Sequence, residues 1–215
     1  METTVIYYTS NREDEEFEKK IRNRLWEAKG NLPLISVSQK PIDFGLNVCV
    51  GDRGVSEQNI LKQMLMGCEL AKTPFVIFAE ADTLYPKEYF NYLPNEKSGW
   101  QAYKKREKRY WFEPVYILYP YSSSLHNSFY LKGRSDCAHM AGREYVISLL
   151  KEAISKGRMM KYRGKDRPIK VILNNPIINI KTGHGMRPKT QTFPIPVLSL
   201  PYWGNARDLR EELLK

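Results

Sequence analysis

The first part of the chain alternates between short apolar runs and amphipathic stretches, which predicts strands and helices in turn. Residues 4–9 (TVIYYT) are β-branched and aromatic and predict a buried strand. Ser10 and Asn11 are residue types that cap helices, and four acids follow soon after them. An apolar residue then recurs at every fourth position, which predicts one buried helix face that ends near Gly30. The repeating positions are Phe17, Ile21 and Leu25.

The same rhythm continues with two short strands, a second helix and the most apolar strand of the chain. Residues 34–38 and 47–50 predict the two strands. Ser56 is suited to cap the helix, and Pro74 ends it because the residue before proline avoids helical angles. Residues 75–79 (FVIFA) are typical of a parallel strand covered by helices on both faces. This order of elements predicts a Rossmann-like, doubly wound α/β fold.

From residue 100 onward, the expected elements are separated by basic, irregular segments. They are a hairpin with strands at 115–121 and 128–131, a helix at 142–156, strands at 169–173 and 177–180, and a terminal helix at 207–215. No repeat or low-complexity linker divides the chain. We therefore expect one domain made of two halves, residues 1–99 and 100–215.

Composition favours a soluble, cytoplasmic protein. The hydrophobic share of the 215 residues is 42%, enough for a sizeable core. No stretch approaches the roughly 18 apolar residues that span a bilayer, and the N-terminus is acidic where a signal peptide would be apolar. The three cysteines are odd in number and include no CxxC pair, which argues against a disulfide framework or a zinc ribbon. Nothing in the sequence points to an obligate protein partner.

Charge is distributed unevenly between the two halves. Residues 1–99 hold 12 Lys and Arg against 15 Asp and Glu, a balance of −3, whereas residues 100–215 hold 22 against 9, a balance of +13. A strongly positive half indicates a polyanionic partner, either nucleic acid or a membrane surface. The membrane alternative is disfavoured because the terminal helix is short and carries Glu211 and Glu212.

Two carboxylates directly follow the most apolar strand, in the segment Glu80-Ala81-Asp82. Ligands of open α/β sheets bind beyond the carboxyl ends of the strands. Alternation along an extended segment directs Glu80 and Asp82 to the same side. Two carboxylates there are suited to a divalent cation that shares its remaining coordination positions with phosphates. The plainer alternative is a pair of ordinary polar residues where a strand meets solvent.

Residues 67–90 (GCELAKTPFVIFAEADTLYPKEYF) resemble the central segment of GT-A-fold glycosyltransferases. The shared features are a helix with small residues, an apolar strand and a DxD-type metal motif. The resemblance implies a GT-A fold with a mixed, mostly parallel sheet, and transfer of a sugar from a nucleotide-sugar such as a UDP-sugar. It also implies Mn²⁺ or Mg²⁺ at the motif. Asp82 matches the last aspartate of that motif, and Glu80 replaces the first.

The resemblance extends to several expected contacts outside the central segment and makes residues 1–99 the donor-binding half. A late glycine-flanked loop is expected to bring His184 to the metal as a further ligand. Expected contacts to the nucleotide-sugar are Thr9, Ser10, Gln39, Arg53, Glu80 and Arg187.

Transfer that inverts the sugar linkage requires a general base close to the acceptor hydroxyl. Asp136 is our first candidate and His139 our second, although Asp136 is equally suited to cap a helix. Cys137 and His139 do not predict zinc, because two ligands without partners do not form such a site. The sequence does not distinguish inversion from retention.

The basic half interleaves cations with aromatic residues, which suits a phosphate backbone and exposed bases. Similar small, basic GT-A transferases decorate hydroxymethylated bases in phage DNA, so we expect double-stranded DNA as the acceptor, in a host cytoplasm if the chain is phage-encoded. The base would have to leave the stack to reach the sugar. Expected DNA contacts are Lys104, Lys105, Arg106, Lys108, Arg109, Arg163 and Lys165.

Other readings remain open. A glycan or a small molecule is an alternative acceptor. A nucleotidyltransferase would use the same fold, but it normally needs a glycine-rich phosphate loop after the first strand, and residues 9–12 contain no glycine. A non-catalytic DNA-binding module would leave Glu80 and Asp82 unexplained.

Overall fold

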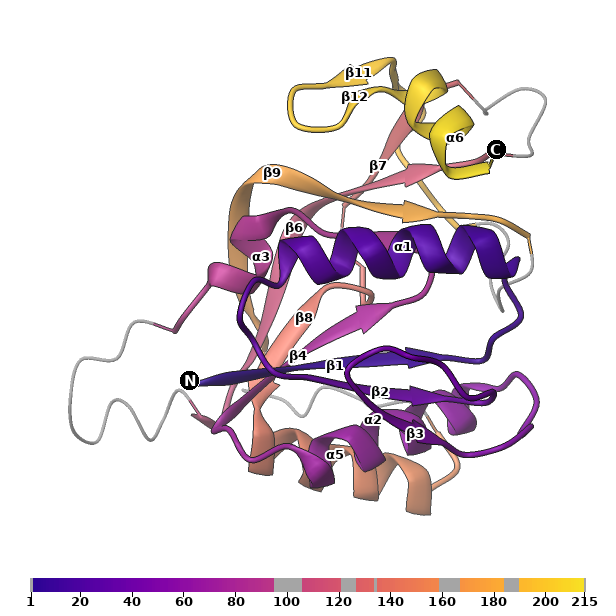
Figure 1. Ribbon diagram of the computed structural model, residues 1–215. Helices are drawn as coiled ribbons and strands as arrows, with labels where there is room; N and C mark the ends of the chain where they lie inside the picture. Colours follow the sequence, from indigo (N-terminus) through magenta and orange to yellow (C-terminus); the bar gives the residue numbers. More distant parts are fainter. Residues whose placement is uncertain are drawn as a thin grey trace.

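The computed structural model describes residues 2–94, 106–120, 127–133, 135–158, 167–183 and 190–214. The chain forms a mixed sheet with helices on both faces (Figure 1). The main strand order is β10-β7-β6-β8-β4-β1-β2-β3, and β9 pairs with both β6 and β5. The predicted α/β class, with a mixed central sheet flanked by helices, is confirmed.

The first half contributes four parallel strands. They are β1 (Thr3–Thr9), β2 (Leu34–Ser38), β3 (Leu46–Cys49) and β4 (Phe75–Glu80), and β1 lies between β2 and β4. The register pairs Tyr8 with Glu80 and Thr9 with Ser38, so three strands end together at one edge. Ligand sites of parallel α/β sheets form at such an edge.

Helices α1 (Glu15–Ala28) and α3 (Lys87–Asn91) cover one face of these strands, and α2 (Glu57–Leu70) and α5 (Arg143–Ser155) cover the other. The residues of β4 consequently alternate between two cores. Ile77 packs on the side of α1 and α3, whereas Phe78 packs on the side of α2 and α5. Burial on both faces explains why residues 75–79 form an unbroken apolar run.

The predicted start of α1 was wrong by a few residues. Asp14 caps the helix by accepting a hydrogen bond from the Phe17 N–H, at 3.0 Å. Asn11 instead has a left-handed backbone angle, φ +52°, which is incompatible with a right-handed helix. Ser56 caps α2 as predicted, accepting a hydrogen bond from the Asn59 N–H at 3.1 Å.

The second half extends the same sheet. β6 (Arg109–Leu118) and β7 (Phe129–Gly133) pair antiparallel as the predicted hairpin, and β8 (His139–Gly142) lies between β6 and β4. β8 therefore joins the two halves through backbone hydrogen bonds on both of its edges.

β9 (Ile169–Ile180) runs parallel to β6 as one strand, although two strands were predicted there. Its register shifts opposite Glu113 and Val115, so the polar residues near Pro176 are accommodated as an irregularity within the strand. β5 (Thr83–Leu84) adds a short antiparallel pairing with β9.

The C-terminal segment adds β10 (Pro196–Val197), the pair β11 (Ser199–Leu200) and β12 (Gly204–Asn205), and α6 (Ala206–Leu214). α6 packs near α1, where the Arg24 guanidinium hydrogen-bonds the Glu212 carboxylate (Figure 1). Across the described ranges, no helix combines the length and the apolar character needed to cross a bilayer.

Candidate active site

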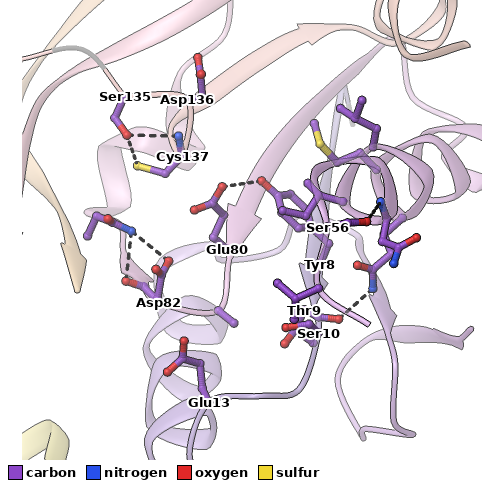
Figure 2. A pocket seen from close by; sticks show the side chains of 18 of the residues that line it. Tyr8, Thr9, Ser10, Glu13, Ser56, Glu80, Asp82, Ser135, Asp136 and Cys137 are labelled. Atoms are coloured by element: carbon purple, nitrogen blue, oxygen red, sulfur yellow. Dashed lines mark hydrogen bonds between the residues drawn. The ribbon is translucent and has the colours of Figure 1, made fainter. Parts of the chain in front are cut away.

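A pocket of ≈ 430 Å³ opens at the carboxyl ends of β1 and β4 (Figure 2). Tyr8 and Glu80 come from these two strand ends, and Ser56 comes from the start of α2. The second half contributes the turn between β7 and β8 and the end of β9. The volume of the pocket lies within the usual range of small-molecule sites, about 300–1,000 Å³.

Glu80 and Asp82 both line this pocket, although Asp82 lies in the turn after β4 and not in the extended segment that the alternation argument assumed. The Tyr8 hydroxyl donates a hydrogen bond to Glu80 Oε1 at 2.7 Å, and the Glu80 N–H donates to the Tyr85 hydroxyl at 3.0 Å. Burial, and secondly the charge of Asp82, raise the pKa of Glu80 to about 7. The Asp82 carboxylate therefore lies close enough to oppose the ionisation of Glu80.

Asp82 is fixed by β9. Asn179 Nδ2 donates a hydrogen bond to Asp82 Oδ1 at 2.9 Å, and the Ile180 N–H donates to the Asp82 backbone oxygen at 2.7 Å. These contacts follow from the pairing of β5 with β9, which sets Thr83 opposite Asn179. The Lys181 Nζ lies 3.9 Å from Asp82 Oδ2. The carboxylate thus keeps one orientation toward the pocket.

The end of β1 and the loop that follows it form another part of the wall, which includes Thr9 and Ser10. The Thr9 hydroxyl donates to the buried carboxylate of Glu18, which also accepts from the Tyr7 hydroxyl at 3.0 Å. Asn11 Oδ1 accepts the backbone N–H groups of Gln39 and Lys40, at 2.8 and 2.9 Å. Asn11 therefore ties two loops together instead of capping a helix.

Gln39 lines the pocket, but its amide mainly holds the loop that follows β3. Its Nε2 donates to the Gly54 backbone oxygen at 2.8 Å, and its Oε1 accepts the Arg53 N–H at 2.8 Å. The Arg53 side chain is exposed, donates to the Val50 backbone oxygen at 3.0 Å and does not line the pocket. The expected contact of Arg53 with the nucleotide is therefore not supported by its position.

The two candidate bases differ sharply in environment. Asp136 is exposed, lines the pocket and caps no helix, since α5 begins at Arg143. His139 is buried and stacks on Phe78 with ring centroids 4.4 Å apart. Burial and the charge of Arg109 lower the pKa of His139 to about 3, and Nε2 is closed off from solvent. His139 also lines the pocket, but this environment favours Asp136 over His139 as the general base.

Arg109 is also placed differently from the prediction. It begins β6, is only 4% exposed and lines the pocket, so it does not reach a phosphate backbone at the surface. Arg106 is exposed and Lys108 is partly buried. The other predicted DNA contacts lie outside the described residues: Lys104, Lys105, Arg163 and Lys165.

Among the residues that the structure describes, no cluster of three or more His, Cys, Asp or Glu side chains is suited to a metal ion. Glu80 and Asp82 supply two carboxylates, and the oxygen chemistry suits Mg²⁺ or Mn²⁺. His184 and Arg187, the remaining expected site residues, lie outside the described ranges.

Sequence reasoning missed several polar side chains of the pocket, notably Tyr8, Asn179 and Lys181. Asn179 and Lys181 alternate at the end of an apolar strand, as Glu80 and Asp82 do. The same argument from alternation would have marked them. Tyr8 gave no signal, because a tyrosine within an apolar run is typical of the core.

Comparison with solved structures identifies the fold. Neither a protein-family model nor a curated protein matches the chain. A glycosyltransferase involved in the glycosylation of the major capsid of PBCV-1 matches 99% of this chain and 98% of its own, with a TM-score of 0.51 and 6% identity.

Residues 1–349 of S. aureus TarS match less well, with a TM-score of 0.46 and 12% identity over 84% of this chain. The complex of the same protein with UDP-GlcNAc matches with a TM-score of 0.46 and 13% identity over 85% of this chain. The chain spans only 61% and 59% of these two TarS chains. Along nearly its whole length, then, the chain has a GT-A-type fold that it shares with the solved PBCV-1 glycosyltransferase.

Proposed function

We propose that the protein is a glycosyltransferase that moves a sugar from a nucleotide-sugar, such as a UDP-sugar, to a hydroxyl group. The observation that carries this proposal is the pair of carboxylates, Glu80 and Asp82, in one pocket at the ends of β1 and β4. The fold shared with the PBCV-1 glycosyltransferase supports it. The resemblance of residues 67–90 to the GT-A metal-motif segment is a separate argument from sequence.

A divalent cation, Mn²⁺ or Mg²⁺, is part of the proposal. Glu80 and Asp82 would hold it, and His184 remains a proposed further ligand. The fit rests on the two carboxylates that line one pocket, because carboxylate oxygens are the ligands that these cations prefer. A cation there would also offset the charge of Asp82 beside the buried Glu80 carboxyl. When bound, the cation would supply positive charge beside the departing diphosphate.

The residues of the chain have separate roles in this proposal. Tyr8 and Asn179 orient the two carboxylates by hydrogen bonds of 2.7 and 2.9 Å. Thr9 and Ser10 would contact the nucleotide, at the end of β1 and the start of the following loop, where Glu18 accepts the Thr9 hydroxyl and Asn11 accepts the Gln39 N–H. Asp136 would accept the proton of the acceptor hydroxyl, since it is an exposed carboxylate in the same pocket.

Asp82→Asn tests the proposal. The amide keeps the shape of the side chain but removes its charge, so sugar transfer should fall by about 100-fold or more while the fold persists. Transfer is measured with a panel of nucleotide-sugars, and Mn²⁺-dependent thermal stabilisation by UDP-sugars is measured beside it. Glu16→Gln, at an exposed acid of α1, is the matched control. Full activity of Asp82→Asn would refute the role of the carboxylate pair.

For the acceptor, we propose a hydroxymethylated base in double-stranded DNA. The balance of +13 in residues 100–215, against −3 in residues 1–99, supports a polyanionic acceptor. The test incubates the protein with nucleotide-sugars and DNA containing hydroxymethylcytosine or hydroxymethyluracil, and analyses the nucleosides by mass spectrometry. Unmodified DNA is the control. Transfer to glycans or small molecules but to neither modified DNA would overturn this acceptor and leave the transferase proposal standing.

A further inference from the structure

Lys181 follows the last residue of β9 and its side chain lines the pocket between the two halves of the sheet. Its backbone N–H donates to the Leu118 oxygen at 2.9 Å, which continues the hydrogen bonding between β9 and β6. The side chain is only 11% exposed. A largely buried ammonium group requires acceptors or a counter-charge to remain charged.

The contacts of the ammonium group are incomplete within the described ranges. Its Nζ lies 3.9 Å from Asp82 Oδ2, which is longer than a hydrogen bond. No other side chain or backbone oxygen of the described residues accepts a hydrogen bond from it. Lys132, a second lysine of the pocket, differs in this respect because its Nζ donates to the Ser135 hydroxyl at 3.0 Å. The donors of Lys181 thus remain available to a ligand.

The charges around Lys181 indicate which kind of ligand it would meet. Lys181 lies beside Asp82, and its charge also acts on Glu80. The two positive charges of a divalent cation would balance only the two negative charges of these carboxylates, and would leave the charge of a bound diphosphate without a counter-charge. A departing nucleoside diphosphate gains further negative charge as its bond to the sugar breaks, so another cation at the same place would stabilise it.

We propose that Lys181 binds the diphosphate of the nucleotide-sugar and stabilises it as it leaves. This inference rests on the proposed function. The bond between the anomeric carbon and the diphosphate oxygen breaks, and its electron pair stays on that oxygen. The acceptor oxygen forms the new bond to the anomeric carbon, and its proton passes to the base proposed as Asp136. Lys181 donates hydrogen bonds to the diphosphate throughout and transfers no proton.

Lys181→Met tests the contact by calorimetry with UDP, uridine and inorganic pyrophosphate, each with and without Mn²⁺. Affinity for UDP and pyrophosphate should fall about 10- to 100-fold, which corresponds to the free energy of one hydrogen bond to a charged group. The affinity for uridine, which has no phosphate, should not change. Lys181→Arg should retain most of the diphosphate affinity. Lys151→Met, at an exposed lysine of α5, is the control for loss of one positive charge. Lys181→Gln serves as a second variant if the methionine variant does not fold.

The outcomes separate the possible roles. If Lys181 only positions Asp82, then Lys181→Met and Asn179→Ala should both weaken Mn²⁺-dependent binding and leave metal-free pyrophosphate binding unchanged, which would overturn the inference. Equal UDP and pyrophosphate affinities in the wild type and Lys181→Met would also overturn it and leave the proposed function intact. Failure of the wild-type protein to bind either UDP or pyrophosphate would overturn both.

Discussion

Glu80 takes its properties from its two neighbours, Tyr8 and Asp82. The Tyr8 hydrogen bond favours the ionised carboxylate, whereas burial and the charge of Asp82 favour the protonated form more strongly. The pKa of Glu80 consequently lies near 7, so a modest pH change alters the charge of the pocket. Perturbed carboxyl groups of this kind are common at functional sites.

The raised pKa of Glu80 predicts a pH dependence of stability. Between its ordinary pKa of 4.5 and about 7, the folded protein holds this proton more strongly than the unfolded chain does. The contribution of Glu80 to stability is therefore full below pH 4.5 and is lost as pH rises through 7. Glu80→Gln should remove this loss, so its stability relative to the wild type should increase from pH 5 to pH 8. Urea unfolding without metal measures the difference, and an unchanged difference across that range would contradict the prediction.

Single residues could be predicted where local alternation decides their direction. Glu80 ends β4 and Asp82 lies in the turn after it, and both line the pocket as expected, although the turn replaces the extended segment that alternation assumes. Arg109 could not be placed in this way, because it begins β6, whose position depends on pairing with β8, and β8 in turn pairs with β4. His139 illustrates the same limit, since its stacking on Phe78 joins residues far apart in sequence. Long-range packing of this kind leaves no local pattern.

At the scale of elements, α2 lies unusually close to β1. A Cβ atom added at Gly67 would lie 2.5 Å from Ile6 Cγ2, and Ile6 is fully buried. The helix therefore approaches the strand that carries Tyr8 and Thr9 into the pocket only because this position has no side chain. The start of α2 was correctly predicted and its end lies a few residues before Pro74, but this contact could be seen only in the structure.

Gly67→Ala should destabilise the protein by about 1–2 kcal/mol. Overpacking costs about 1–3 kcal/mol, and the better helix propensity of alanine recovers up to about 1 kcal/mol. Urea unfolding measures the change. Met66→Ala, at the neighbouring exposed position of the same helix, should change stability by about 0.5 kcal/mol or less. If Gly67→Ala were as stable as the wild type or more stable, β1 would have to make room for the added methyl group without loss of stability.

At the scale of the molecule, the two halves differ in charge but share one sheet. β8 pairs with β4 on one edge and with β6 on the other, and the pocket takes residues from both halves. The charge imbalance was readable from sequence alone. The order of the strands was not, because β8 follows β6 and β7 in sequence yet lies between β4 and β6 in the sheet.

Reversing the charges of Lys105 and Arg106 should weaken DNA binding in a salt-dependent manner. Log affinity falls with log salt concentration, and each lost phosphate contact makes this dependence shallower by about one unit of slope. The slope should therefore become less negative by about two. Binding is measured by fluorescence anisotropy between 50 and 200 mM salt, roughly the range where such contacts matter. Lys19→Glu, on the acidic half, is the control. An unchanged slope would contradict a role for these residues in DNA binding and would favour other acceptors.

The attachment of Asp82 to β9 has a consequence for synthesis on the ribosome. Glu80 and Asp82 emerge early, but Asn179 and Ile180, whose hydrogen bonds hold Asp82, follow nearly a hundred residues later. A nascent chain that stops short of β9 carries both acids without their restraint. The site can therefore reach this geometry only after β9 has been synthesised, which delays ligand capture until β9 has joined the sheet.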